Sequence, residues 1–507
     1  MSALLRLRAT ARRPEAALFT LAFGAYAYFF QAGGWNQNSR FDTVRAIVEQ
    51  HSLIIDDYAG NTGDFAVVNH HFYGDKAPGL SMLAVPVYAA VYPLAHGQRV
   101  HGRVVSLGAY LATLVGVALP AALAVVALRR TAVRLGTTEA AAAGLAVAYA
   151  FGTLAFPYAT LFYSHQLTAS LLLLAFALLV GEKGEPPRAA RTARRLLLAG
   201  LLLGYAVATE YPAALAVAVL AGYALAVTRP RARVVWLALG GVVPALALAV
   251  YHTAVFGGPL TVGYNSSPDS AREGGLVLGI TLPSARVLWK VLFSTDRGLL
   301  HHAPWLVFAL PGLVRMVRSR ALRAEGLACA GVIAAGLWFN SSLTSTPGDW
   351  KGGAGIGTRH LVPSLPFWVL AVAGLAVRPA RGWRARPRVR WAGAAVLGVL
   401  VALSASRMLM ATAVRPEPYL VDDPFEDYIL PRWRSGQVAV NTIPIHTGFT
   451  EGEPQAWNLG QKMGLRGRAS LLPLGLFAAA AGAWLAMATR DKRPAASPSP
   501  AAGAPAS

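Results

Sequence analysis

Charged side chains are scarce in this sequence of 507 residues. They form 14% of the chain, whereas a soluble protein carries about 25%, and the mean hydropathy is +0.45. Apolar runs of about 20 residues, each long enough to cross a bilayer, recur along the whole length. These features exclude a soluble globular protein and predict an all-α integral membrane protein.

Other absences narrow the chemistry. The one cysteine, Cys329, lies in an apolar run, so the chain cannot form an intramolecular disulfide. The phosphate-loop pattern GxxxxGK[ST] is missing, and no metal-spaced motif surrounds the adjacent His70 and His71. We also find no internal repeat, which many transporters carry. The sequence therefore lacks the usual signatures of a disulfide scaffold, a nucleotide site and a zinc site.

About twelve apolar runs are predicted to span the membrane. The first could be a signal peptide, but its length and the lack of a clear cleavage site favour a retained helix. A further run, 77–95, contains Pro78, Pro86 and Pro93 and is predicted to be an interfacial helix. The spanning runs fall at about 15–32, 104–128, 137–156, 165–181, 195–212, 213–228, 234–252, 302–317, 322–344, 360–377, 391–411 and 470–488.

The net charge of +22 would suit a nucleic-acid binder. The positive-inside rule accounts for it without nucleic acid, because most Lys and Arg fall in segments on one side of the predicted spans. Both termini are then cytoplasmic, and the Ala- and Arg-rich composition suggests the inner (plasma) membrane of a bacterium. The basic segments are 1–14, 129–136, 181–195, 228–233, 315–323, 378–390 and the residues after 488.

This topology divides the chain into five parts. They are a basic cytoplasmic N-terminus (1–14), a first transmembrane helix (15–32), an outer loop with interfacial helices (33–103), a helical membrane domain (104–488) and a tail (489–507). The domain includes outer loops at 253–301, 345–359 and 412–469. The tail is rich in Pro, Ala and Ser, so we expect it to be disordered and cytoplasmic.

The first outer loop is the expected active site. Its segment SRFDTVRAIVE predicts a short amphipathic helix that carries Arg40, Asp42, Arg45 and Glu49. Asp42 suits a general base or a ligand for a cation. The alternative is a juxtamembrane helix whose charges are merely solvated.

A second segment of this loop, HHFYGDKAPG, places Lys76 directly after Asp75 and before the interfacial run. An ammonium group at headgroup depth can hold a lipid phosphate, although a lysine there can also simply snorkel. Glu210, at the outer end of a predicted span, is a further candidate because ionisable groups in membranes are costly.

Two later outer segments carry arginine beside histidine. FSTDRGLLHHAPWLVF contains Arg297, and TPGDWKGGAGIGTRHLVPSLPF contains Arg359 and His360 at the start of a span. An arginine at a helix N-terminus favours anions. The competing interpretation is an interfacial anchor.

Together these segments resemble the GT-C class of membrane glycosyltransferases, in particular the lipid A aminoarabinose transferases and the protein O-mannosyltransferases. SRFDTVRAIVE follows the first span as the family's acidic, arginine-containing helix does. FYGDKAPGLS is similar to the family's YFEKPPL, and LRRTAVRLG is similar to its GRRLFG. RGLLHHAPWL and GTRHLVPSLPF look like segments of bacterial relatives. The resemblance implies a GT-C-like fold.

The resemblance also implies transfer of a sugar from a polyprenyl-phosphate carrier to a lipid, glycan or protein acceptor on the outer face. Lys76 would hold the carrier phosphate. Gln37 and Asn38 occupy the place of the family's leading acid, and Asp42, about one turn later, is the candidate base. Asp75 matches the acid before the family lysine. The assisting groups would be Arg40, Arg297, Arg359 and His360.

Several alternatives stay open. Relatives differ in metal dependence, so a divalent cation (Mg²⁺ or Mn²⁺) and a metal-free reaction are both compatible with the sequence. A lipid or lipid-linked-sugar flippase is the main rival function. A polymerase or ligase of another fold and a non-catalytic relative are the others, and the missing leading acid favours the last of these.

Overall fold

The computed structural model describes residues 13–94, 98–181, 189–266, 280–343, 350–377, 387–418, 421–447 and 452–490, with backbone alone at 98–101 and 387–390. Nearly all of the predicted N-terminus and tail lie outside these residues. So do parts of the predicted basic segments 181–195 and 378–390 and parts of the three later outer loops.

The described chain is 73% helical with almost no sheet, which confirms the predicted all-α class. Every apolar run predicted to span the membrane overlaps a helix of the bundle. The helices are α2 (Pro14–Ala27), α3 (Trp35–Gln50), α4 (Gly79–Val91), α5 (Gln98–Thr113), α6 (Leu119–Arg134), α7 (Glu139–Phe151), α8 (Ala155–Tyr158), α9 (Ser164–Val180), α10 (Ala189–Thr209), α11 (Ala213–Val227), α12 (Val235–Phe256), α13 (Ala285–Phe293), α14 (Leu299–His302), α15 (Ala309–Arg318), α16 (Arg323–Ser342), α17 (Leu365–Ala376), α18 (Pro387–Val414), α19 (Leu430–Arg434), α20 (Leu459–Lys462) and α21 (Leu472–Arg490).

Within the described residues, six helical stretches are long and apolar enough to cross a bilayer by themselves. Four shorter apolar helices, of 10–17 residues, accompany them. The chain is therefore a multi-pass membrane protein, while the total of about twelve spans stays a prediction. The six are Gly102–Arg134, Ala189–Thr209, Arg231–Phe256, Arg359–Ala376, Trp391–Val414 and Gly467–Arg490.

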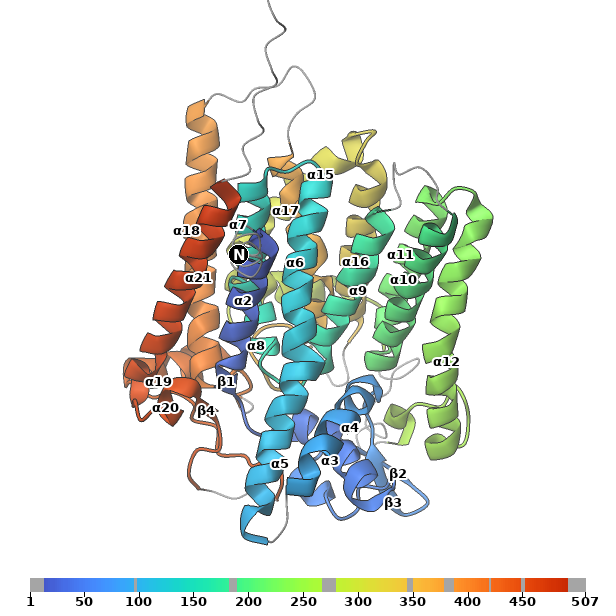
Figure 1. Ribbon diagram of the computed structural model, residues 1–507, viewed down its shortest axis with the longest axis vertical. Helices are drawn as coiled ribbons and strands as arrows, with labels where there is room; N and C mark the ends of the chain where they lie inside the picture. The colour runs from blue at the N-terminus through green and yellow to red at the C-terminus, as the bar shows by residue number, and fades with distance from the viewer. Residues whose placement is uncertain are drawn as a thin grey trace, which may run out of the picture.

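One end of the bundle carries a cap built from the first loop. Helices α3 and α4 lie there together with strands β2 (Phe65–Val68) and β3 (His71–Gly74), at the bottom of Figure 1. The two strands pair antiparallel. Helix α4 is apolar, contains Pro86 and sits below the upright helices, which agrees with the interfacial position predicted for 77–95. We call this the cap end.

A short two-stranded ladder ties the beginning of the chain to its end. Strand β1 (Phe29–Phe30) pairs antiparallel with β4 (Trp457–Asn458). The Asn441 side chain also donates hydrogen bonds to the Gln31 and Gly33 carbonyls, at 2.6 and 2.8 Å. The segment around Asn441 is therefore anchored beside the start of α3, although more than 400 residues separate the two in sequence.

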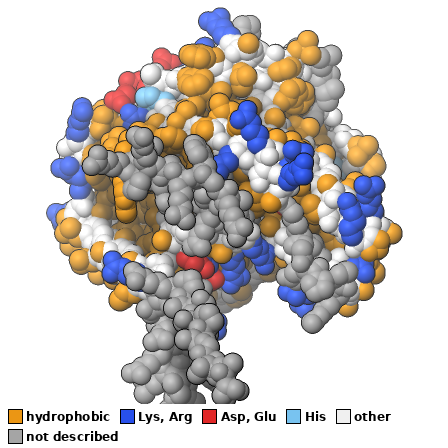
Figure 2. Space-filling view, turned by 90° about the horizontal axis from the view of Figure 1, so that it is seen from above, with side chains coloured by type: hydrophobic (Ala, Val, Ile, Leu, Met, Phe, Trp, Pro, Cys, Tyr) orange, Lys and Arg blue, Asp and Glu red, His pale blue; other side chains and the backbone are white. Residues whose placement is uncertain are grey.

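The opposite end of the bundle is rich in basic side chains. Arg129 donates to Glu15 at 2.7 Å and also contacts Glu139, while Arg315 donates to the Val377 carbonyl at 2.7 Å. Figure 2 looks onto this end, and Lys and Arg side chains are spread over the face. Basic residues thus mark the end away from the cap, the distribution that the positive-inside rule uses.

Helices α10 and α12 approach one another through glycine. A Cβ at Gly200 would lie 1.9 Å from the Leu237 carbonyl oxygen, and one at Gly240 would lie 2.0 Å from the Leu197 carbonyl oxygen. Small residues let helix backbones pack this closely in membranes. This contact holds the two helices that form one wall of a groove described below.

Replacing Gly240 by valine is expected to destabilise the protein by about 1–3 kcal/mol, because overpacking forces the helices apart. Thermal unfolding in one detergent would measure the loss. Gly222→Val on α11 is the matched control, since no atom lies within 4 Å of a Cβ at that position. Equal melting temperatures for the two variants would contradict the proposed packing.

Candidate functional site

The geometry of α3 separates the charges predicted to act together. Successive residues of an α-helix are about 100° apart, so Arg40 and Asp42 point in opposite directions, whereas Asn36, Gln37 and Arg40 share one side. Arg40 faces the bundle and is 3% exposed. Asp42 is fully buried on the far side, where its carboxylate accepts from the Asn61 side chain at 3.1 Å.

Arg40 joins three elements on the inner side of α3. Its Nη2 lies 3.2 Å from Glu210 Oε1, its Nη1 donates to the Ala77 carbonyl at 3.0 Å, and its Nε donates to Asn36 at 3.1 Å. Glu210 also accepts from the Ser164 hydroxyl. Arg40, predicted to assist with phosphate, is thus fixed in a buried ion pair with Glu210.

Lys76 sits between two carboxylates. Its Nζ lies 2.9 Å from Asp75 Oδ2 and 3.3 Å from Asp64 Oδ2, and 5.0 Å from the centre of the Tyr264 ring. Burial disfavours the charge of Lys76, but Asp64 and Asp75 outweigh it and raise the pKa of Lys76 above its ordinary value. The two carboxylates therefore favour the charged form of Lys76.

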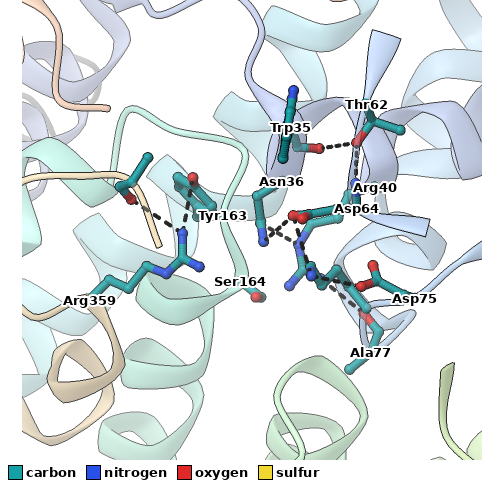
Figure 3. A network of polar contacts seen from close by, with 12 residues as sticks. Trp35, Asn36, Arg40, Thr62, Asp64, Asp75, Ala77, Tyr163, Ser164 and Arg359 are labelled. Atoms are coloured by element: carbon teal, nitrogen blue, oxygen red, sulfur yellow. Dashed lines mark hydrogen bonds and ion pairs between the residues drawn. The ribbon is translucent and has the colours of Figure 1, made fainter. Parts of the chain in front are cut away.

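Arg359 lies on the side of the candidate site that faces α3 (Figure 3). It begins the 3₁₀ turn Arg359–Ser364 that leads into α17. Its guanidinium lies 5.6 Å from the Tyr163 ring centre, and Nη1 donates to the Tyr163 hydroxyl at 3.4 Å and to the Ala354 carbonyl at 3.3 Å. The buried Nε has no hydrogen-bond partner among the described residues.

Figure 3 shows how these walls are arranged. Arg359 and Tyr163 lie on one side, Asn36, Arg40 and Asp64 lie on the other, and Ser164 lies between them. A cation of α3 and a cation of the 3₁₀ turn before α17 therefore border the candidate site, together with hydroxyl and carboxylate groups (Figure 3). Such a set can hold an anionic group and exchange a proton beside it.

The glycine-rich segment 352–357 braces Arg359 rather than forming a phosphate loop. Gly352, Gly353, Gly355 and Gly357 all have positive φ, from 65° to 132°, a conformation that side chains disfavour. A Cβ at Gly353 would lie 2.6 Å from Arg359 Nη2. The glycines thus let the backbone fold closely around the arginine.

Two other predicted site residues, Arg297 and His360, lie beside this glycine-rich segment. Arg297 is 1% exposed and contacts the Gly353 carbonyl, and its own carbonyl accepts from Thr358 at 3.0 Å. The His360 ring packs edge-on against His165, with centroids 4.9 Å apart. Arg297 therefore supports the loop, and its predicted phosphate contact stays a prediction, as does a substrate contact by His360.

The two residues predicted to act as bases, Asp75 and Asp42, lie in different surroundings. Asp75 is buried and holds Lys76, and one of its carboxylate oxygens has no partner among the described residues. Burial raises the pKa of Asp42 well above its usual range, with Arg45 and Asn61 opposing it. The structure brings Asp75 into the site with Lys76 and leaves Asp42 behind α3. Both catalytic roles stay predictions.

Sequence reasoning missed Glu417, which follows α18. Its carboxylate accepts from the Tyr163 hydroxyl at 2.5 Å and from Gln37 Nε2 at 3.1 Å. Gln37 Oε1 in turn accepts from the Phe162 amide at 3.1 Å. The one available signal was an acidic residue directly after the predicted span 391–411, and Glu417 shares it with other acids of that loop.

An apolar groove of about 860 Å³ opens beside the Lys76 segment. It lies between α4, α10 and α12. Its lining includes Tyr73, Pro78 and Gly79, which flank Lys76 in the chain, and Leu248 and Tyr251 of α12. The groove thus offers an apolar surface next to the charged site.

The sequence is compatible both with a metal ion in the site and with a metal-free reaction. Across the part of the chain that the structure describes, no group of three or more His, Cys, Asp or Glu side chains could hold an ion. Two carboxylates of the site, Asp64 and Asp75, meet at the ammonium of Lys76. A divalent cation, Mg²⁺ or Mn²⁺, stays an open prediction.

Comparison with known proteins gives structural likenesses alone, since no family model and no curated protein matches the sequence. The chain is similar to ArnT from Cupriavidus metallidurans, solved with undecaprenyl phosphate, at a TM-score of 0.48 and 15% identity over 94% of this chain and 75% of that one. It is also similar to the Archaeoglobus fulgidus oligosaccharyltransferase AglB, solved with an inhibitory peptide and a dolichol-phosphate, at a TM-score of 0.45 and 12% identity over 86% and 61%.

Both of these proteins are GT-C glycosyltransferases, the class that the sequence segments resemble. The scores and identities are low, so the activity of this chain has to be inferred from its own residues.

Proposed function

We propose that this protein is a membrane glycosyltransferase that moves a sugar from a polyprenyl-phosphate donor to a lipid, glycan or protein acceptor. The observation that carries the proposal is the groove beside Lys76. A polyprenyl phosphate combines a long apolar chain with an anionic head. The groove between α4, α10 and α12 suits the chain. Lys76 lies in the sequence between the lining residues Tyr73 and Pro78, which supports a phosphate site for Lys76 at the edge of the groove.

The transfer breaks the bond between the anomeric carbon and the phosphate oxygen, and the electron pair leaves with the phosphate. Lys76 and Arg359 stabilise that developing charge from opposite walls. The acceptor oxygen attacks the anomeric carbon in a single displacement, which inverts its configuration, and its proton passes to a carboxylate. Asp42 and Asp75 are the bases predicted from the sequence.

The charge distribution supports a reaction on the outer face. Under the positive-inside rule, the basic end of the bundle faces the cytoplasm and the cap end faces outward. Both termini are then cytoplasmic, in the inner (plasma) membrane of a bacterium. The site residues Arg40, Lys76, Glu210 and Arg359 gather near the cap end, which supports transfer at the membrane surface over passage of a lipid through the bilayer.

Release of free polyprenyl phosphate, measured by mass spectrometry, tests this function. Purified protein would be mixed with polyprenyl-phosphate sugars and a crude envelope acceptor. Lys76→Ala is expected to lower release at least tenfold, because the leaving phosphate loses a charge-assisted hydrogen bond. Lys76→Arg should retain part of the activity, since it keeps the positive charge.

The matched control is Lys462→Ala, which removes an exposed lysine from α20, outside the site, and should leave release unchanged. Parallel reactions with EDTA, and with Mg²⁺ or Mn²⁺ added back, test the cation requirement. Wild-type protein that binds the lipid but releases no polyprenyl phosphate from any donor would overturn the transferase in favour of a flippase or a non-catalytic relative.

A further inference from the structure

The Glu417 carboxylate is held by several contacts at the edge of the candidate site. Tyr163 and Gln37 each donate a hydrogen bond to it, and it is 7% exposed. The preceding Pro416 accepts from the Ile356 amide at 3.0 Å, which docks this segment on the glycine loop. A Cβ at Gly34 would lie 2.4 Å from Glu417 Oε2, so the absence of a side chain at Gly34 makes room for the carboxylate.

The partners of Glu417 distinguish it from the other carboxylates of the site. Asp64 and Asp75 contact the Lys76 ammonium, and Glu210 contacts the Arg40 guanidinium. The two hydrogen bonds to Glu417 come from a phenol and an amide, both of them neutral. Among the described residues Glu417 forms no direct ion pair, although the charges of Arg359 and Arg415 act on it. Such a carboxylate is the stronger proton acceptor, because no ion pair has to be broken first.

Glu417 is also connected to Arg359, one of the two residues proposed to hold the phosphate. The Tyr163 hydroxyl donates to Glu417 at 2.5 Å and accepts from Arg359 at 3.4 Å, so a single phenol joins the carboxylate to the cation. Burial raises the pKa of Glu417, while the Tyr163 hydrogen bond and the Arg359 charge oppose that rise. A higher pKa strengthens a general base that must take a hydroxyl proton.

We propose that Glu417 is the general base of the transfer, a role that rests on the function proposed above. The acceptor O–H bond breaks as its proton moves to the Glu417 carboxylate. The acceptor oxygen forms the new bond to the anomeric carbon, and the bond from that carbon to the phosphate oxygen breaks with its electron pair going to the phosphate. Gln37 and Tyr163 act as positioning residues that aim the carboxylate.

Because Gln37 and Glu417 are hydrogen-bonded to each other, exchanging the two residues moves the carboxylate across that contact. Glu417→Gln removes the base but keeps a side chain of the same size, so kcat for release should fall by about 10²–10⁴-fold, the usual contribution of a general base. The double variant Gln37→Glu/Glu417→Gln returns a carboxylate to the other side of that 3.1 Å contact. It should recover at least tenfold over the single variant.

A second test separates a chemical role from a structural one. Glu417→Ala opens space in which added formate can act as a base, so release should rise with formate concentration. Glu453→Gln, at an exposed position of the same outer loop, is the matched control and should neither lose activity nor respond to formate. Thermal unfolding of each variant shows whether it is folded.

The outcomes separate the two proposals. Wild-type protein that is active, with Glu417→Gln equally active, overturns the role of Glu417 and leaves the transferase standing. A folded but inactive Glu417→Gln that the swap does not restore, together with a folded Glu417→Ala that formate does not rescue, also overturns it, because the residue is then structural. Wild-type protein inactive with every donor overturns the transferase itself.

Discussion

Replacing Arg359 by alanine is expected to lower the release of polyprenyl phosphate by about 100- to 1,000-fold, the usual loss when one donor to a developing anion is removed. Arg359 borders the site from the wall that faces α3 (Figure 3). Its buried Nε has no hydrogen-bond partner among the described residues. Steady-state kinetics with a fixed donor would show the loss mainly in kcat.

Arg359→Lys should recover part of this loss, because it restores the charge but not the planar, forked donor geometry of arginine. Arg434→Ala removes an exposed arginine on α19, outside the site, and controls for a general loss of positive charge. A loss below about threefold for Arg359→Ala would remove this residue from the phosphate site, since a charge-assisted hydrogen bond is worth more than that.

Replacing Glu210 by alanine is expected to destabilise the protein by about 3–5 kcal/mol, because the change leaves the buried Arg40 guanidinium without its counterion. The pair is 3.2 Å apart, with side chains 2% and 11% exposed. Thermal unfolding in detergent would report the loss. The double variant Arg40→Met/Glu210→Leu should regain most of the stability, because apolar groups can replace a buried ion pair.

The control for this prediction is Asp422→Ala, which breaks the contact of Asp422 with Lys351 at 3.4 Å at a fully exposed carboxylate. Its melting temperature should stay close to that of the wild type, because solvent screens such pairs. A melting temperature of Glu210→Ala that also equals the wild-type value would show that Arg40 does not depend on Glu210.

The sequence alone determined the class of the molecule and part of the site. Composition and apolar runs required a helical membrane protein, because hydrocarbon-facing helices must be apolar over about 20 residues. The order Asp75–Lys76 before the interfacial helix located the lysine beside an apolar surface. The sequence reasoning placed Arg40 and Asp42 in one site because it followed the charges of the segment, although helical periodicity puts the two residues on opposite sides of α3.

The tertiary structure decided which groups meet. Glu417 reaches Gln37 across 380 residues and Tyr163 across 254, and no local pattern in the sequence encodes contacts of that range. The fold of the glycine-rich segment 352–357 places Arg297 against its backbone, while Arg359 borders the candidate site. Such choices depend on how separate loops dock on the ends of the helices, because a buried charge is tolerated only where the whole fold brings it a partner.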